Sequence, residues 1–220
     1  MIKFGILLID KPAGITSHDV VDIVRKKFNL QPIGHAGTLD PIATGLLIIL
    51  VGRATKQFNR FVNFDKEYTA ILRLGAQTDS GDAQGKIIAT ADYQEISQER
   101  VSAVLKSLEG KIENIPPMVS AIKHKGRPLY LLARKGITVE RKARLVNIHQ
   151  LKCLRFSLPD IELQISCSKG TYIRSLGEEI ARRLNSVGHI TWIRRTAIGP
   201  YAVSDAKKID SFDENDIRTI

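Results

Sequence analysis

One pair of adjacent segments constrains the fold more than any other feature of this chain. Residues 144–156 and 161–168 are both rich in apolar side chains, and they flank the turn sequence Ser157-Leu-Pro-Asp160. This arrangement predicts two antiparallel strands joined as a hairpin. Helical spacing of apolar residues predicts helices at 17–28 and 97–109. Strands and helices therefore follow one another irregularly, which favours an α+β fold with a largely antiparallel sheet.

The remaining elements come from the same patterns. The sequence predicts strands at 1–10, 46–51, 66–74 and 189–197, and helices around 54–62, at 128–135 and at 173–187. On the strand 66–74, alternation places Tyr68 on the same side as the apolar positions. No linker, repeat or shift in composition marks a boundary, so we expect residues 1–220 to form a single domain.

Composition excludes several classes of protein. Hydrophobic residues make up 43% and charged residues 25% of the 220 residues, which is ordinary for a soluble globular chain. The longest apolar run, residues 46–51, is far shorter than the roughly 20 residues that a spanning helix needs. The N-terminus has no features of a signal peptide, so we expect a cytoplasmic protein. Cys153 and Cys167 form neither a disulfide framework nor a zinc site by themselves.

Positive charge is concentrated in one part of the chain. The formal net charge is +10, and residues 123–155 contain ten Lys or Arg against one acidic residue, Glu140. A second basic cluster consists of Lys169, Arg174, Arg182, Arg183, Arg194 and Arg195. Such residues can simply form a solvated face. Their concentration nevertheless favours a phosphate-binding surface and hence a nucleic-acid partner.

Two glycine-containing stretches are candidates for a site. In residues 34–41, Gly37 permits a tight turn, and His35 and Asp40 could both point into one cleft. A surface turn with an exposed histidine is the alternative. In residues 166–174, Lys169 and Gly170 precede a predicted helix, and helix N-termini attract anions. Arg174 lies one turn into that helix, where it could reach a carboxylate.

The acidic loop at residues 74–85 does not fit a metal site. Asp79 and Asp82 are three positions apart, and no acidic residue stands where a calcium loop has its bidentate glutamate. We therefore expect no metal.

Seven ordered motifs then reveal a resemblance to a known family. They are DKPAGITS (10–17), GHAGTLDPIATG (34–45), KEY (66–68), LGAQTDSGDAQG (74–85), PMVSAIKHKGRPLY (117–130), CSKGTYIR (167–174) and RR (194–195). In this order they resemble the tRNA pseudouridine synthase B (TruB) family, and they cover nearly the whole chain. One motif differs, because Val119 stands where the family usually has tyrosine.

The resemblance implies a fold and a reaction. The fold would be the pseudouridine synthase fold, a mixed, mostly antiparallel sheet with flanking helices and a central RNA-binding cleft. The reaction would convert uridine to pseudouridine in the T-arm loop of tRNA, at position 55 in tRNA numbering. We expect base flipping, no cofactor and a monomer. Many members of the family carry a C-terminal PUA domain, and none is evident in this sequence.

The resemblance also assigns roles to residues. Asp40 corresponds to the catalytic aspartate, which acts at the ribose, and Arg174 to the partner of its carboxylate. Tyr68 would stack on the base and assist proton transfer. Further positions that match substrate-binding residues are His35, which would enter the RNA as the base leaves, and Tyr172, Ile193, Lys11, Lys169 and Lys123. Two alternatives remain: a tRNA-binding or folding protein without turnover, and a guide-RNA-dependent synthase that acts on ribosomal RNA.

Overall fold

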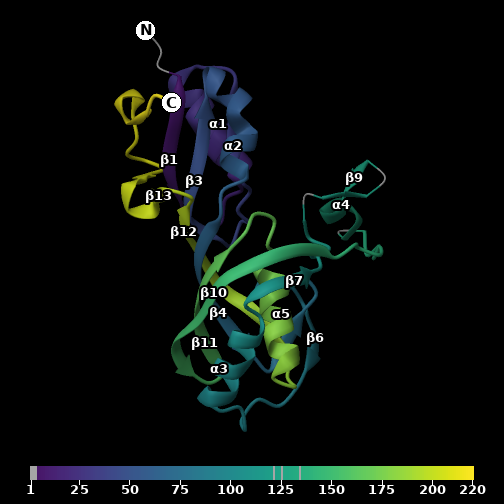
Figure 1. Cartoon of the computed structure of the whole chain (residues 1–220). Coiled ribbons are helices and arrows are strands. Elements are labelled where there is room, and N and C mark those ends of the chain that lie inside the picture. Colours follow the sequence, from purple (N-terminus) through teal and green to yellow (C-terminus); the bar gives the residue numbers. More distant parts are fainter. Residues whose placement is uncertain (1–3, 121, 125, 134) are drawn as a thin grey trace. The chain divides into compact units, whose positions relative to one another are not determined.

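The computed structural model describes residues 4–220 except residues 121, 125 and 134 (Figure 1). The chain folds into two compact units. The terminal unit comprises the chain up to residue 69 together with residues 193–220, and the central unit comprises residues 70–192. The chain leaves the terminal unit within strand β4 (Lys66–Leu74) and returns to it within strand β12 (Gly188–Ile198).

The terminal unit is organised around strand β3. Its strands are β1 (Gly5–Lys11), β2 (Ile33–Ala36), β3 (Thr44–Val51), the end of β12, β13 (Tyr201–Ala202) and β14 (Lys207–Lys208). β1 runs antiparallel to β3 over its whole length, and the two strands lie side by side in Figure 1. On its other edge β3 pairs with β2 along its second half and with β12 at its first two residues. Because nearly every residue of β1 and β3 is buried, their sequences are continuous apolar runs without alternation.

Helix α1 (Ser17–Phe28) has the predicted bounds, and its first turn explains why it begins there. The Asp19 backbone N–H donates to Thr16 Oγ1 at 3.0 Å, and the Thr16 N–H donates to Asp19 Oδ2 at 2.7 Å. This reciprocal capping box satisfies donors that the first turn leaves open. Asn29 ends the helix in the left-handed conformation.

The helix predicted around residues 54–62 differs from the structure. The segment begins as a 3₁₀ helix, η1 (Gly52–Gln57), and continues as the short α-helix α2 (Phe58–Val62). Ala54 and Phe61 are buried as expected, but Phe58 is 44% exposed. A 3₁₀ turn has three residues and not 3.6, so the two pieces do not present one continuous apolar face. The Phe61 ring packs against Phe64 and Tyr201.

The central unit is built on the predicted hairpin. β10 (Arg144–Ser157) and β11 (Asp160–Cys167) pair antiparallel around the turn, β7 (Gly110–Asn114) pairs with the other edge of β10, and β4 lies beside β11. Helix α3 (Gln98–Ser107) packs against β10 and against helix α5 (Ile173–Arg183) (Figure 1). The α+β class with a mostly antiparallel sheet is therefore confirmed.

Several short elements of the central unit were not predicted or have other bounds. The unpredicted strands are β7, β5 (Ala76–Thr78) with β6 (Ile87–Thr90), and β8 (Lys123–His124) with β9 (Arg127–Pro128). Helix α4 (Leu129–Ala133) is shorter than expected. In the terminal unit, two 3₁₀ turns were also not predicted, η2 (Val203–Asp205) and η3 (Glu214–Asp216). α5 ends at Arg183 and not at residue 187, because Asn185 adopts a positive φ of 60°. Among the described residues, no helix combines the length and apolar character needed to cross a bilayer.

Gly45 on β3 provides a test of this packing. Its φ is +101°, and a Cβ built there would lie 2.2 Å from the Arg195 carbonyl oxygen on β12. We expect Gly45→Ala to lower the free energy of unfolding by about 3 kcal/mol or more, because strain and a backbone clash add. Gly14→Ala is the matched control, since Gly14 has a φ of +90° with open space around its Cβ position. It should cost only about 1 kcal/mol in the same urea titration. Equal losses would contradict the close pairing of β3 with β12.

Candidate active site

The backbone around Asp40 is fixed by residues of the preceding helix and loop. The Leu39 N–H donates to Ser17 Oγ at 2.8 Å, and Ser17 Oγ donates to the Leu39 carbonyl at 3.1 Å. On the other side of Asp40, the Pro41 carbonyl accepts from the Gly14 N–H at 2.8 Å. Asp40 itself is half-buried. Its carboxylate is therefore carried by a loop whose backbone is held on both flanks.

His35 lies on strand β2, an element that the sequence patterns did not predict. β2 has just four residues and its middle positions are half-buried, so it lacks the apolar alternation by which strands are recognised. Burial lowers the pKa of His35, and the nearby Arg195 lowers that pKa further. Its Nδ1 atom is buried without a hydrogen-bond partner. The imidazole is therefore held in its neutral form at neutral pH.

Strand register places two cations on either side of a glycine. Lys11 on β1 lies opposite Gly45 on β3, and Arg195 on β12 lies opposite the same Gly45. Residues aligned across neighbouring strands project to the same face of a sheet. Both cations also interact electrostatically with Asp40. The terminal unit thus brings one half-buried carboxylate together with two buried cations.

The Lys11 side chain is fully buried. Its Nζ donates to the Pro12 and Ile15 carbonyls at 2.8 Å each. Burial lowers the pKa of Lys11 to about 8, against an opposing contribution from the Asp40 carboxylate. The predicted role of Lys11 in substrate binding stays a prediction, and what is observed is an ammonium group that orders the turn after β1.

Arg195 is one of the most deeply buried side chains of the terminal unit, with 1% of it exposed. Its Nε donates to the Leu46 carbonyl at 2.8 Å, and its Nη2 donates to the Gly37 carbonyl at 3.0 Å. The guanidinium also interacts electrostatically with the Tyr68 side chain. Burial lowers its pKa from the ordinary value, while Tyr68 and Asp40 act in the opposite direction. Arg195 is therefore an interior residue, and its assignment to a basic surface cluster was wrong.

Tyr68 and Ile193 lie on the strands that connect the units. Tyr68 on β4 is 8% exposed and belongs to the buried side of the alternation, as predicted. Ile193 on β12 is buried and stands two positions before Arg195, so both side chains share one face of the strand. The Ile193 carbonyl accepts from Thr44 Oγ1 at 3.4 Å. Tyr68, Ile193 and Arg195 thus belong to the same unit as Asp40.

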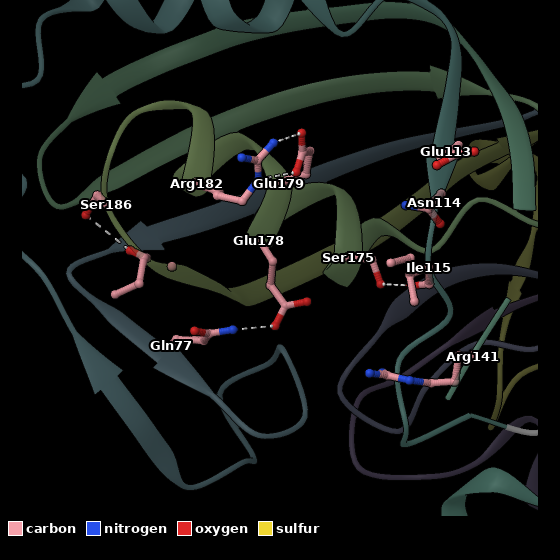
Figure 2. A pocket seen from close by; sticks show the side chains of 12 residues that line it. Gln77, Glu113, Asn114, Ile115, Arg141, Ser175, Glu178, Glu179, Arg182 and Ser186 are labelled. Carbon is pink, nitrogen blue, oxygen red and sulfur yellow. Dashed lines mark hydrogen bonds and ion pairs between the residues drawn. The ribbon is translucent and has the colours of Figure 1, made fainter. Parts of the chain in front are cut away.

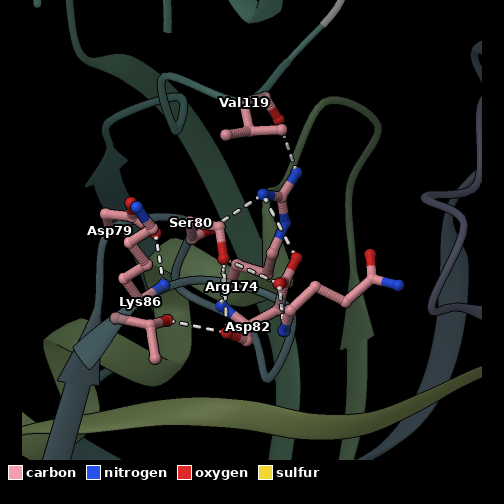
Figure 3. Close-up of polar contacts among 8 residues, drawn as sticks. Asp79, Ser80, Asp82, Lys86, Val119 and Arg174 are labelled. Atoms are coloured by element: carbon pink, nitrogen blue, oxygen red, sulfur yellow. Dashed lines mark hydrogen bonds and ion pairs between the residues drawn. The ribbon is translucent and has the colours of Figure 1, made fainter. Parts of the chain in front are cut away.

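Arg174 is buried in the central unit by contacts with a loop that follows β5 (Figure 3). Its Nη1 donates to the Ser80 carbonyl and its Nη2 to the Val119 carbonyl, both at 2.8 Å. The same Nη1 lies 3.6 Å from Asp82 Oδ2. The prediction that Arg174 belongs to a basic surface was therefore wrong, because its donors face backbone carbonyls and a carboxylate in the interior.

Side-chain bonds order the loop that holds Arg174. Ser80 Oγ donates to Asp82 Oδ1 at 2.7 Å, and the Gln84 N–H donates to the same oxygen at 3.0 Å. Asp79 Oδ1 accepts from the Lys86 N–H at 2.9 Å. These carboxylates therefore shape a turn. Within the described part of the chain, no group of three or more His, Cys, Asp or Glu is arranged to hold a metal ion.

The other predicted binding residues of the central unit differ in exposure. Tyr172 is half-buried, and its backbone N–H and carbonyl are both held by the Asn114 side chain, at 2.8 Å and 3.3 Å. Lys169 and Lys123 are exposed. Of the basic stretch 123–155, the exposed members are Lys123, Arg127, Lys135, Lys142, Arg144, Lys152 and Arg155, whereas Lys125 and Arg134 lie outside the described residues.

A separate cavity of about 340 Å³ lies in the central unit (Figure 2). Polar side chains from β5, β7, α5 and the segment before β10 line it, among them Gln77, Glu178 and Arg141. Burial raises the pKa of Glu178, whose Oε1 accepts from Gln77 Nε2 at 3.4 Å. None of the residues singled out by the sequence motifs as catalytic or substrate-binding lines this cavity.

Comparison with known proteins identifies the class. The fold is that of a pseudouridine synthase. A family model described as "TruB family pseudouridylate synthase (N terminal domain)" matches residues 25–173. This chain belongs to the TruB family of pseudouridylate synthases.

Named relatives support this membership. The tRNA pseudouridine synthase B of Francisella philomiragia is 46% identical over 94% of this chain and 69% of its own length. That of Aromatoleum aromaticum is 46% identical over 92% of this chain and 65% of its own length. A crystal structure of a Cbf5-Nop10-Gar1 complex contains a chain that is 29% identical with a TM-score of 0.74, over 94% of this chain and 54% of that one. The chain therefore spans about two thirds of the length of these curated relatives.

The lowered pKa of Lys11 predicts a pH dependence of stability. Its pKa is about 8 in the folded state and 10.5 ordinarily, so the penalty for burying the ammonium is fully present below pH 8. Between pH 8 and 10.5 the folded chain releases the Lys11 proton, whereas the unfolded chain still keeps it. The penalty therefore disappears, and the free energy of unfolding increases, as the pH rises through this range. Relative to Lys11→Met, the wild type should gain about 3 kcal/mol of unfolding free energy across this range. Urea titrations at several pH values measure this difference. A constant difference between the two proteins would contradict the buried ammonium.

Proposed function

We propose that this chain converts uridine to pseudouridine in tRNA, with Asp40 acting at the ribose. The observation that carries the proposal is Asp40 itself, a half-buried carboxylate on an ordered loop in the company of Lys11 and Arg195. Nearby cations stabilise the ionised form of a carboxylate, which is the form that can act on a ribose carbon. The family to which the chain belongs and its tRNA-modifying relatives supply the reaction.

The reaction balances without a cofactor. The bond between uracil N1 and C1′ breaks, and C1′ is then held covalently by the Asp40 carboxylate or stabilised as a cation. The uracil rotates and forms a bond from C5 to C1′. The C5 proton is removed and N1 acquires a proton, so nothing is added overall. A route in which Asp40 removes a ribose proton to give a glycal has the same balance.

Other residues have supporting roles in this proposal. Tyr68 stacks on the flipped uracil and takes part in removing the C5 proton. Neutral His35 fills the space that the uracil leaves in the RNA stack, which offsets part of the unstacking cost. Tyr172 and Ile193 contribute to binding the base. The role of Arg174 as partner of the Asp40 carboxylate also stays a prediction.

Substrate recognition follows from charge and shape. We propose that the exposed basic residues of the stretch 123–155, together with Lys169, contact phosphates of the T-arm of tRNA. Structured RNA is recognised largely through its shape and backbone, which suits a basic surface without a base-reading helix. Identity of 46% to tRNA-modifying relatives, against 29% to the Cbf5 chain, favours tRNA over a guide-RNA-dependent substrate.

Asp40→Asn separates catalysis from binding. We expect it to abolish release of tritium from tRNA labelled at uridine C5, because an amide can neither trap C1′ nor take up a proton there. Affinity for tRNA in filter binding should be unchanged or higher, since a charge that repels phosphates is removed.

Asp22→Asn is the matched control for this substitution. Asp22 lies on α1 in the same unit, half its side chain is exposed, and its partners are Arg25 and His18 on the same helix. This variant should release tritium at the wild-type rate. Full turnover by Asp40→Asn would overturn the proposed mechanism, and absence of turnover in the wild type would favour a binding protein.

Salt dependence tests the basic surface. Lys123→Ala should weaken tRNA binding and reduce the slope of log K against log[salt] by about 1, as expected when one phosphate contact is lost. Lys208→Ala, an exposed lysine of β14 in the terminal unit, should leave the slope unchanged. Equal effects of the two substitutions would show that only the total charge matters.

A further inference from the structure

The hydroxyl group of Ser17 forms two hydrogen bonds with one residue of the loop that carries Asp40. It accepts from the Leu39 N–H at 2.8 Å and donates to the Leu39 carbonyl at 3.1 Å. A serine hydroxyl has one proton to donate and lone pairs that accept, so it can bind both backbone groups of one residue. Ser17 is 2% exposed and Leu39 is 4% exposed, so both bonds are shielded from water. The side chain therefore acts on Leu39 as a paired strand would, by holding its N–H and its carbonyl together.

Every carbonyl from residue 37 to residue 41 accepts a hydrogen bond. The donors are Arg195 for Gly37 and Thr38, Ser17 for Leu39, the Ala43 N–H for Asp40, and the Gly14 N–H for Pro41. Three of these donors lie outside the loop, on β12, on α1 and in the turn between β1 and α1. The loop is thus held through its backbone by separate parts of the terminal unit.

These bonds hold both peptide groups that flank the Asp40 Cα atom. The Leu39 carbonyl and the Asp40 N–H belong to one planar peptide group, so the Ser17 hydroxyl sets the orientation of that plane. The next peptide group joins Asp40 to Pro41, and its carbonyl accepts from the Ala43 N–H at 3.0 Å. A residue before proline is also restricted in its backbone angles. The direction in which the Asp40 side chain leaves the backbone is thereby determined.

We propose that Ser17 is a positioning residue whose hydroxyl directs the Asp40 carboxylate towards the ribose of the target uridine. Ser17 is the first residue of α1, a helix whose apolar face is buried in the terminal unit. The hydroxyl therefore transmits the position of a packed helix to the loop. The catalytic consequence rests on the proposed function, whereas the two hydrogen bonds do not.

A role of Ser17 in starting the helix is the alternative. α1 is capped by Thr16, whose Oγ1 accepts from the Asp19 N–H at 3.0 Å. The Ser17 hydroxyl instead reaches a residue 22 positions further along the chain. Val24→Ala is a matched control, because Val24 is fully buried on the same helix, about two turns from Ser17. Both Ser17→Ala and Val24→Ala should lower the midpoint of unfolding in urea, so only the positioning role distinguishes them.

The first test observes Leu39 directly and needs no RNA. Thr38-Leu39 is the only Thr-Leu pair in the sequence, so ¹³C at the threonine carbonyl and ¹⁵N in leucine select the Leu39 amide signal. We expect Ser17→Ala to shift this signal, because the amide loses its acceptor. Val24→Ala should leave the signal in place. An unchanged Leu39 signal in Ser17→Ala would overturn the proposal.

A second measurement uses the wild type and covers the case in which Ser17→Ala does not fold. The Leu39 amide proton should show a nuclear Overhauser effect to the Cβ protons of Ser17, since Ser17 Oγ lies 2.8 Å from the Leu39 nitrogen. Protein prepared with serine deuterated at Cβ should lack this effect. A Leu39 amide without an Overhauser effect to serine Cβ protons would exclude the contact and with it the proposal.

Kinetics then test the consequence for catalysis. In single turnover with tRNA, Ser17→Ala should be slower by about 10- to 100-fold, as expected when a reacting group is misplaced by up to about 1 Å. Affinity for tRNA should change less than about threefold, because no phosphate contact is lost. Val24→Ala should turn over at close to the wild-type rate. Equal slowing by both substitutions would assign the effect to stability and overturn positioning.

Ser17→Thr keeps a hydroxyl and tests rescue. Across Ser17→Ala and Ser17→Thr, the rate should follow the Leu39 signal, so a variant that keeps the signal should keep the rate. A Ser17→Thr variant with the wild-type Leu39 signal and the slow rate of Ser17→Ala would overturn the proposal. A wild type without turnover would remove the proposed function and leave the two spectroscopic tests valid.

Discussion

The terminal unit depends on the alignment of three strands at Gly45. β1 places Lys11, and β12 places Arg195, beside the same residue of β3. A side chain on residue 45 would occupy the face between these two cations, and its Cβ would collide with the Arg195 backbone. Register is fixed over seven residue pairs between β1 and β3, so the position of Lys11 follows from burial of an apolar strand rather than from any local polar preference.

Two buried cations are costly unless their protons are bonded. Lys11 and Arg195 both meet this requirement mainly with backbone carbonyls, and Asp40 contributes charge without being their sole partner. Carbonyl dipoles fixed by strands and loops need no reorganisation when charge changes nearby. Asp40 is half-buried, and the backbone of the residue before it, Leu39, is held by Ser17. The Asp40 carboxylate therefore stays partly exposed, while the two cations that interact with it lie in the interior.

The sequence predicted those elements whose apolar pattern was sufficient to define them. α1 and β4 have the predicted bounds, because a capping box and strict alternation mark their residues directly. β2 was not predicted, since it is short and its hydrogen bonds come from β3, far along the chain. The candidate site residues were chosen by motif, whereas the burial of Arg195 was not predicted. In the sequence, Arg195 next to Arg194 looks like part of a charged surface. Its burial follows from its pairing with Gly45 on another strand, and that pairing is visible only in the structure.

Burial of Arg174 and Arg195 changes how the net charge of this chain should be interpreted. Each guanidinium is held by carbonyls within its own unit, so neither is presented to solvent as the second basic cluster implied. The charge that a polyanion can meet comes instead from the exposed lysines and arginines of the stretch 123–155, where counterions are released on contact with phosphate. Interior arginines cannot release counterions in this way. The basic residues therefore fall into two groups: exposed ones, to which the proposed function assigns contacts with tRNA, and buried ones, whose donors are held by backbone carbonyls.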